Sequence, residues 1–372
     1  MVRNNTQPAG LLQEHFAYAS VIIFITAFIC VNLLTPIVIR ISFHKRLATP
    51  INERSSHLSR TPPFGGVTFY IIFILSISTI QSILGQSLGY SIIAAISILF
   101  IVGLKDDLIH STAKAKLTYQ LLAAVCIVLC TQLRIDLPFT NIYLYTGLSF
   151  FLSAFLVVLI INAYNLIDGI DGLAASMGII ISIVYAIIFY LLKDIFFSLL
   201  NIIIASTLIA FLRFNLSKNK IKIFMGDCGS LVIGLMISIH TLRFLALPIS
   251  TSVHFWGYGF YDKFLTICVI LFIPFLDTAR IIILRLINGK NLFKADKNHV
   301  HHVLVNYGLS HIETSIILST VQISIIIMFF LLSESVSLIM LSAVVVFAFV
   351  MSTLLLSLID RKGNTRITTG GS

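Results

Sequence analysis

The chain has 372 residues, of which 58% are hydrophobic and 11% are charged, and its formal net charge is +10 at pH 7. Soluble globular domains carry about 25% charged residues, so this composition excludes that class. It indicates an integral membrane protein with many spans.

Apolar segments follow one another along nearly the whole chain. Most approach the roughly 20 residues that a helix needs to cross the bilayer, and flanking residues can extend the shorter ones. The sequence therefore predicts an all-α polytopic membrane protein with about eleven transmembrane helices, of which the fourth has the weakest signal. The predicted segments are 17–41, 66–84, 88–104, 117–131, 147–164, 173–192, 197–212, 230–248, 264–287, 315–332 and 335–359.

Basic residues predict the orientation of these helices. Twenty of the 25 lysines and arginines fall in alternate connections that share one side of the membrane. Cytoplasmic loops carry the excess of positive charge, so we expect the N-terminus outside and the C-terminus in the cytoplasm. The acidic residues at helix ends are predicted to share the cytoplasmic face, namely Asp106, Asp107, Asp168, Asp171, Asp227 and Asp296.

The first polar motif is GLKDDL, residues 103–108, at the end of the third helix. Neighbours on a helix point about 100° apart, so Asp106 and Asp107 are expected to do two different jobs. A close pair of carboxylates raises one pKa, which suits a proton acceptor or a group that steers a phosphate. A solvated helix end is the alternative.

The second motif is NAYNLIDGIDGLAA, residues 162–175, which directly follows a membrane-spanning run. Asn162 and Asn165 share one helix face, and Asp168 and Asp171 have the same spacing. The two glycines of the motif leave room for a ligand to approach the backbone. A simple cap and turn would need fewer polar groups, and the spacing does not fit a calcium EF-hand loop.

The third motif is FMGDCGSLVIG, residues 224–234, at the start of the eighth helix. A helix start favours anions, and a carboxylate there, such as Asp227, can hold Mg²⁺ against a phosphate. Phe224 can stack on a flat base. A helix cap and an interfacial aromatic are the alternatives for these two residues.

The fourth motif is KADKNHVHHVL, residues 294–304, in a connection with further lysines. His299, His301 and His302 can bind zinc, but the surrounding lysines would repel a cation, so a diphosphate fits better. An amphipathic loop on anionic lipid headgroups is the alternative. Asp277 and Arg280, one helical step apart in the ninth run, are expected to neutralise each other.

Together these motifs resemble the polyprenyl-phosphate N-acetylhexosamine-1-phosphate transferase family, glycosyltransferase family 4. The resemblance runs through nearly the whole membrane region, from PINERSSH through GLKDDL, NAYNLIDGIDGLAA and FMGDCGSLVIG to DTARIIILRLINGK and DKNHVHHVL. Members transfer a sugar 1-phosphate from a UDP-sugar to a lipid phosphate and release UMP. The DxxHxHH pattern is similar to the N-acetylglucosamine branch, whose carrier in bacteria is undecaprenyl phosphate.

The resemblance also implies roles for individual residues. Asn165 and Asp227 would hold Mg²⁺, for which Mn²⁺ is a candidate substitute, while Lys116, His299 and His301 would neutralise the donor diphosphate. Asp106 and Asp107 would lie beside the lipid phosphate, and Phe224 near uracil. The nucleotide-binding turn would hold Asp168 and Asp171. The implied catalytic residues are Asp106, Asp107, Asp168, Asp227 and His301, and the implied substrate-binding residues are Lys116, Asn162, Asn165, Asp171, Phe224, His299 and His302.

One departure concerns His110, which stands where some members have an acidic residue; a metal role for His110 is therefore not expected. Whether Asp106 or Asp107 acts as a general base stays open, because a phosphate acceptor is already anionic at neutral pH. Deoxy-amino sugars related to N-acetylglucosamine also stay open as donors.

We expect one membrane domain over residues 1–372. Within it we expect a transmembrane catalytic core at 14–360, a cytoplasmic loop with the HxHH motif at 285–314 and a disordered tail at 361–372. The resemblance places the protein in the bacterial cytoplasmic membrane with its site facing the cytoplasm. Membrane lipids are expected partners and nucleic acid is not, while a homodimer stays open.

Two other functions have to be weighed. A secondary transporter is also polytopic and carries acidic residues and histidines, but transporter sites usually lie near the bilayer midplane. An inactive scaffold would not need the whole polar set. The predicted location of the motifs at helix ends favours the transferase.

Overall fold

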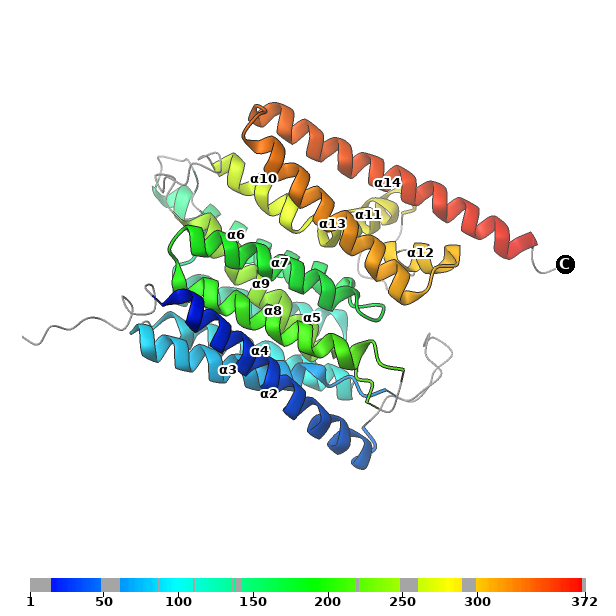
Figure 1. The fold of residues 1–372 in the computed structure, drawn as a ribbon. Coiled ribbons are helices and arrows are strands. Elements are labelled where there is room, and N and C mark those ends of the chain that lie inside the picture. Colours follow the sequence, from blue (N-terminus) through cyan, green and yellow to red (C-terminus); the bar gives the residue numbers. More distant parts are fainter. Residues whose placement is uncertain are drawn as a thin grey trace, which may run out of the picture. The chain divides into compact units, whose positions relative to one another are not determined.

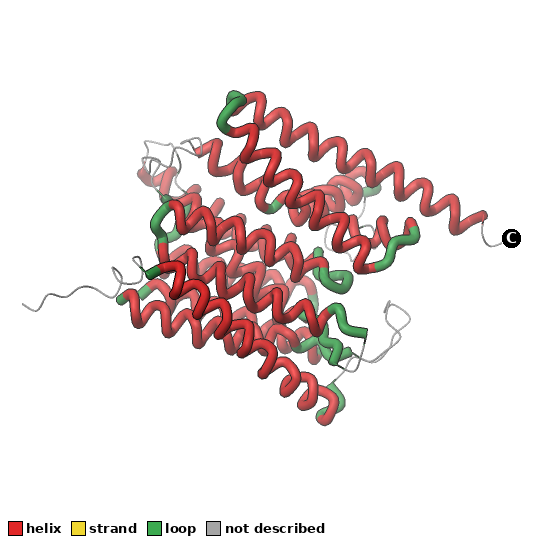
Figure 2. Tube along the Cα trace, viewed as in Figure 1, coloured by secondary structure: helices red, strands yellow, loops and turns green. Residues whose placement is uncertain are grey.

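The structure, a computed structural model, describes residues 15–47, 61–85, 87–109, 111–135, 137, 142–218, 221–247, 260–289 and 299–369. Every regular element in these ranges is a helix, as Figure 2 shows. Ten of the described helices are long and apolar enough to cross a membrane, and a bent pair brings the number of candidate spans to eleven. The predicted all-helical polytopic fold is confirmed, whereas the side on which each terminus lies stays a prediction.

The chain forms two compact units. Unit 1 comprises residues 1–161 and 178–246, and unit 2 comprises residues 162–177 and 247–372. Unit 1 holds α2 (Phe16–His44), α3 (Gly65–Leu84), α4 (Leu88–Leu108), α5 (Ala113–Thr131), α8 (Ile195–Asn215), α9 (Gly226–Ala246) and most of α6 (Ile142–Leu166) and α7 (Leu173–Leu191). Unit 2 holds the turn between α6 and α7, together with α10 (Phe260–Ile270), α11 (Phe272–Ile287), α12 (Val300–Tyr307), α13 (His311–Ser333) and α14 (Leu338–Thr369).

Helix α9 lies at the centre of unit 1, where it packs against α3 and α4 (Figure 1). In the apolar 18-residue stretch of α9, 94% of the residues are buried. In the corresponding stretch of α14 in unit 2, the buried share is 11%. Glycines allow the three backbones to approach closely. A Cβ on Gly66 would overlap the backbone of Gly229, and a Cβ on Gly103 would lie 2.5 Å from the Cα of Cys228. The start of α3, the end of α4 and the start of α9 are therefore held together at one place.

In unit 2, the apolar run expected as one helix over 264–287 is broken. Helices α10 and α11 meet at Leu271 with a bend of 85°. The sequence gives the reason, because Pro274 has no N–H with which to bond the carbonyl of Ile270. The bend leaves backbone groups of both helices without their helical partners, which is costly inside a membrane.

A glutamine from α13 supplies the missing partners at this bend. The Gln322 side-chain amide donates to the carbonyls of Val269 (2.9 Å) and Ile270 (3.2 Å), and its carbonyl accepts from the N–H of Ile273 (3.0 Å). Gln322 is fully buried. One side chain thus stabilises the break and fixes the direction in which α11 leaves it.

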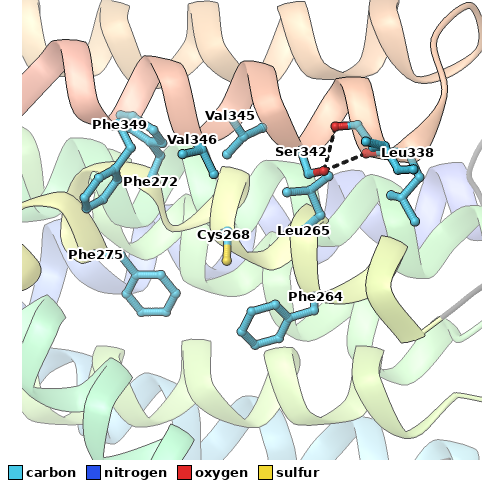
Figure 3. A pocket seen from close by; sticks show the side chains of 11 residues that line it. Phe264, Leu265, Cys268, Phe272, Phe275, Leu338, Ser342, Val345, Val346 and Phe349 are labelled. Carbon is cyan, nitrogen blue, oxygen red and sulfur yellow. Dashed lines mark hydrogen bonds between the residues drawn. The ribbon is translucent and has the colours of Figure 1, made fainter.

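A cavity of about 480 Å³ lies beside the break, between α10, α11 and α14. Figure 3 shows its mainly apolar lining, which includes Phe264, Phe272, Phe275, Val345 and Phe349. The Ser342 hydroxyl donates to the carbonyls of Leu338 and Ile339 in its own helix. Such a lining suits a hydrocarbon chain rather than a phosphate.

Candidate active site

Unit 1 contains a carboxylate–lysine cluster, which we define as Asp106, Asp107, Lys116 and Asp227. Its members come from the last turn of α4, the first turn of α5 and the first turn of α9. The start of α5 is fixed by the side chain of Thr112, which accepts a hydrogen bond from the N–H of Ala115. The close packing of α4 against α9 brings together residues that lie more than a hundred positions apart in the sequence.

Lys116 is the centre of this cluster. Its Nζ lies 2.8 Å from Oδ2 of Asp227 and 3.1 Å from Oδ2 of Asp106. The Asp106 side chain is 8% exposed, whereas those of Lys116 and Asp227 are 22% and 27% exposed. One ammonium group therefore offsets the repulsion between two carboxylates, at a place that a ligand can reach.

Asp107 has a different set of partners from its neighbour Asp106. Its Oδ1 accepts from the N–H of Asp227 (2.8 Å), and its Oδ2 accepts from the N–H of Cys228 (3.0 Å). Asp107 thus satisfies two free amides at the start of α9, where an anion is favoured. Gly226 has a φ of 73°, and a Cβ there would overlap Asp107 and the carbonyl of Pro63, so this entry to α9 requires glycine.

Phe224 lies just before the cluster, in a segment that pairs with residues 62–66. Its N–H donates to the carbonyl of Pro62 (3.0 Å), and its carbonyl accepts from the N–H of Gly65 (2.9 Å). The ring is half-buried, and the Nζ of Lys222 lies 5.3 Å from the ring centroid. The backbone of Phe224 is thus held firmly, while its ring already has a cation close to its face.

Unit 2 contains the other predicted site residues. Asn162 and Asn165 lie in the last turn of α6, and Asp168 and Asp171 lie in the turn that leads to α7; all four are half-buried. The Tyr164 hydroxyl donates to the carbonyl of Ala174 across this turn (2.6 Å). The turn is thus a fixed part of unit 2 rather than a loose connection.

Asp171 connects the same turn to α13. The Ser315 hydroxyl donates to the Asp171 carbonyl (2.9 Å), and Nδ1 of His311 lies 3.5 Å from the Asp171 carboxylate. His311 is the first residue of α13, whose start is stabilised by a reciprocal capping box between Ser310 and Glu313. The position of the turn is therefore set by a helix that lies 144 residues away from it in the sequence.

The three histidines of the fourth motif form a histidine cluster, which we define as His299, His301 and His302. His299 precedes α12, and the other two lie in its first turn. The rings of His299 and His301 are nearly parallel, with centroids 5.6 Å apart, and the centroids of His301 and His302 are 4.3 Å apart. The short helix α12 thus gathers three rings in one place.

His301 packs on the turn between α6 and α7. A Cβ on Gly169 would overlap its ring, so the absence of a side chain there makes room for the histidine. His301 is 2% exposed, and neither ring nitrogen has a hydrogen-bond partner among the described residues. Desolvation by burial, with His302 adding to the effect, lowers the pKa of His301 to about 3. The ring is therefore neutral at pH 7 in this state, and a bound anion would favour its protonation.

The expected pairing of Asp277 with Arg280 is wrong. Asp277 bonds instead to His299 and to the backbone of Val300, whereas Arg280 pairs with Asp360 of α14 at 3.3 Å. Sequence reasoning therefore missed Asp277 as a partner of the histidine cluster. The available signal was a carboxylate three residues after a proline within an apolar run, where burial requires a specific partner.

The magnesium ligands Asn165 and Asp227 stay a prediction. No group of three or more His, Cys, Asp or Glu side chains within the described ranges is arranged to hold a metal ion. Asn165 belongs to unit 2 and Asp227 to unit 1. Asp106 and Asp227 nevertheless supply the oxygen donors that Mg²⁺ prefers, and they already share one cation, so the chemistry of the donors fits a divalent ion.

Several residues that the sequence singled out lie outside the described residues. They are Glu53, Arg54 and His57 of the PINERSSH segment, His110 of the third helix end, and Lys290, Lys294, Asp296 and Lys297 of the connection before α12.

The fold and these clusters define a polytopic membrane protein with phosphate-compatible groups at helix ends. A family model described as glycosyl transferase family 4 matches residues 90–245. A relative from Bacillus subtilis strain 168, described as "Probable undecaprenyl-phosphate N-acetylglucosaminyl 1-phosphate transferase", is 33% identical over 296 residues, covering 78% of each chain. The chain belongs to glycosyl transferase family 4.

Other relatives show the range of the similarity. A decaprenyl-phosphate N-acetylglucosaminephosphotransferase from Mycobacterium leprae is 30% identical over 285 residues, which cover 70% of each chain. A phospho-N-acetylmuramoyl-pentapeptide-transferase from Staphylococcus aureus is 29% identical over 314 residues, covering 79% of this chain and 92% of the relative. The predicted family resemblance is confirmed.

Proposed function

We propose that this protein transfers N-acetylhexosamine 1-phosphate, foremost N-acetylglucosamine 1-phosphate, from a UDP-sugar to undecaprenyl phosphate and releases UMP. The observation that carries the proposal is the 33% identity, over 78% of each chain, to a relative described as a probable undecaprenyl-phosphate N-acetylglucosaminyl 1-phosphate transferase. The product is a diphosphate-linked lipid of the kind that begins the synthesis of envelope glycans such as O-antigen, capsule or teichoic acid.

The carboxylate–lysine cluster has the chemistry to act on the reacting phosphates. Phosphoryl transfer depends on positioning and charge neutralisation more than on a strong base. Lys116 supplies a cation. We propose that the carboxylate of Asp106 helps to orient the acceptor. Both carboxylate oxygens of Asp107 accept hydrogen bonds from backbone N–H groups at the start of α9. Its proposed role is therefore to hold Asp227 in place.

We propose Mg²⁺ as the cofactor, with Asp227 and Asn165 as ligands and Mn²⁺ as a substitute. When bound, the ion would neutralise phosphate oxygens during the transfer. Lys116 lies 2.8 Å from the Asp227 carboxylate, so the lysine would help to hold this carboxylate in position within the cluster.

The histidine cluster and the turn between α6 and α7 are proposed to bind the donor. Imidazole rings and asparagine amides can donate hydrogen bonds to diphosphate, ribose or uracil. His301 is buried and lacks hydrogen-bond partners among the described residues. A bound ligand that forms hydrogen bonds with its ring nitrogens would offset the free-energy cost of its desolvation. Phe224 is proposed to lie near the uracil ring.

A transporter is the second function considered, because α10 and α11 form a broken helix, as many transporter helices do. In this protein, however, Gln322 already satisfies the broken backbone, and the cavity beside the break has a mainly apolar lining. The break therefore offers few groups to a coupling ion. The descriptions of the relatives also favour the transferase.

The decisive test is a donor screen with purified protein. Undecaprenyl phosphate, Mg²⁺ and a panel of UDP-sugars would be incubated with the protein, with detection of UMP and of the lipid product by mass spectrometry. We expect product with UDP-N-acetylglucosamine. The panel must include the UDP-muramoyl-pentapeptide, since one relative is named for it. No product with any donor would overturn the proposal, and exclusive use of the pentapeptide would overturn the sugar assignment.

We further propose that the protein lies in the bacterial cytoplasmic membrane with both clusters facing the cytoplasm. The excess of lysine and arginine in alternate connections supports this orientation. In a variant without its five native cysteines, a cysteine at position 297 should react with an impermeant thiol reagent only from the cytoplasmic side. Labelling of intact cells from outside would invert the topology.

A further inference from the structure

The buried carboxylate of Asp277 has no role in the function proposed so far. Asp277 lies on α11, six residues beyond the bend at Leu271, and is 1% exposed. Its Oδ2 is 2.8 Å from Nδ1 of His299, and its Oδ1 accepts a hydrogen bond of 2.7 Å from the N–H of Val300. Both oxygens are thus used, and both partners belong to the start of α12, more than twenty residues away in the sequence.

This contact fixes the hydrogen-bonding state of one histidine. An ionised carboxylate is an acceptor and has no proton to donate, so Nδ1 of His299 must carry the hydrogen. Nε2 is then the nitrogen left for a ligand, and no hydrogen bond to it comes from the described residues. A proton on Nε2 would make this nitrogen a donor to a phosphate oxygen, while Nδ1 keeps its hydrogen bond to Asp277.

The same carboxylate fixes the position of the whole histidine cluster. His299 has no side-chain cap of its own at the start of α12, and Asp277 provides a cap from α11. A carboxylate at a helix start satisfies free N–H groups and interacts favourably with the helix dipole. Because α12 has only eight residues, an anchor at its start affects His301 and His302 as well.

The anchor itself is held by the bend between α10 and α11. Gln322 fixes the break with three hydrogen bonds, and the direction of α11 places Asp277 against the start of α12. Fixed second partners of this kind are what sets the ring orientation of functional histidines in general. The series runs from Gln322 through α11 and Asp277 to His299, and all of it lies in unit 2.

We propose that Asp277 is a positioning residue for the transfer reaction: it holds His299 with hydrogen on Nδ1 and directs Nε2 toward the diphosphate of the nucleotide-sugar donor. The inference rests on the proposed function for the identity of the ligand. The state of His299 itself does not depend on it.

Asp277→Asn tests this role with little change in shape. The asparagine oxygen can still accept from Val300, but its NH₂ group would face Nδ1 of His299 and force the hydrogen onto Nε2. We expect the KM for the UDP-sugar to rise about 10- to 100-fold, the usual cost of losing such a second partner. The KM for undecaprenyl phosphate should stay unchanged, a separation that general damage to the fold would not produce.

Asp360→Asn is the matched control. It makes the same chemical change and also removes a carboxylate that binds α11, through Arg280, but it does not touch the histidine cluster. We expect donor KM within about twofold of wild type for this variant, since the carboxylate that changes is 30% exposed and contacts Arg280 rather than a histidine. An equal rise in donor KM for both variants would show that any loosening of α11 suffices, and would overturn the proposal.

A double-mutant cycle with His299→Gln separates action through His299 from an independent effect. If Asp277 works through this ring, Asp277→Asn should add little to the donor KM of His299→Gln. Full additivity of the two changes would contradict the inference.

A spectroscopic measurement covers the case in which the Asp277 variant fails to fold. In wild-type protein labelled with ¹⁵N-histidine, the resonances missing from His299→Gln assign the ring. Hydrogen on Nδ1 is expected, in either the neutral or the charged ring, and a neutral ring with hydrogen on Nε2 would overturn the proposal. If the wild type formed no product with any donor, the proposed function would fail, while this measurement would still decide the state of His299.

Discussion

The carboxylate–lysine cluster of unit 1 and the histidine cluster of unit 2 hold their polar groups in different ways. In the first, Lys116 lies within 3.1 Å of two carboxylates, so opposite charges attract each other directly. In the second, the rings pack against one another, and the carboxylate of Asp277 pairs with His299. Every side chain of the first cluster has a polar partner within the cluster or at the start of α9, whereas His301 in the second is desolvated and unsatisfied by the described residues.

This difference suggests that the two clusters contribute to different steps of the reaction. The first cluster presents charged groups that are already in position for phosphoryl transfer. A buried ring without hydrogen bonds destabilises the folded protein, and a ligand that bonds to the ring removes this cost. We therefore expect changes in the first cluster to affect turnover, and changes in the second to affect the apparent affinity for the donor.

Asp227→Asn should have the largest effect. It removes the carboxylate that pairs with Lys116 and that is proposed to hold Mg²⁺. We expect UMP release to fall by about 10³-fold, the scale of losing one preorganised electrostatic group. The variant should elute as folded protein in detergent. Full activity in this variant would remove the metal assignment.

Lys116→Met should come next. It leaves Asp106 and Asp227 without their shared cation, so we expect about a 100-fold loss of kcat with a smaller change in donor KM. Lys114→Met is the control, since Lys114 is an exposed residue two positions earlier in the same helix. A Lys116 variant that resembles this control would show that the ion pairs do not matter for turnover.

Gly169→Ala should affect the histidine cluster without altering a polar group. The new Cβ would overlap the ring of His301 and displace it, so we expect the donor KM to rise about 10-fold, as it should for His301→Ala. Gly147→Ala is the control, because a Cβ at that helical glycine meets nothing within 4 Å. Unchanged kinetics in both Gly169→Ala and His301→Ala would return the cluster to a role at the membrane surface.

The smallest expected effect concerns stability against acid. Burial lowers the pKa of His301 from 6.5 to about 3, so the folded protein resists protonation that the unfolded chain accepts. The contribution of this group to stability is present above pH 6.5 and is lost progressively as the pH falls toward 3. His301→Gln should therefore show a flatter decline of melting temperature between pH 7 and pH 5. An unaltered slope would mean that the ring is not desolvated in solution.

The chain's own pattern was enough to predict the helices and the kinds of residue at their ends. Runs of apolar residues predict spans because a bilayer requires internally bonded backbone, and this holds whatever the neighbours are. The motifs around Asp106, Asn165, Asp227 and His301 were visible for a similar reason, since polar groups at the ends of such runs stand out from their surroundings.

The pairing of those residues was decided by the tertiary structure. Sequence spacing places Arg280 one turn from Asp277, yet Asp277 bonds to His299, which is 22 positions away, and Lys116 pairs with Asp227 across 111 positions. The bend at Leu271 and the close approach of α4 to α9 create these contacts. Charges interact according to their distance in space and their burial, and neither quantity can be obtained from spacing along the chain beyond a single helical turn.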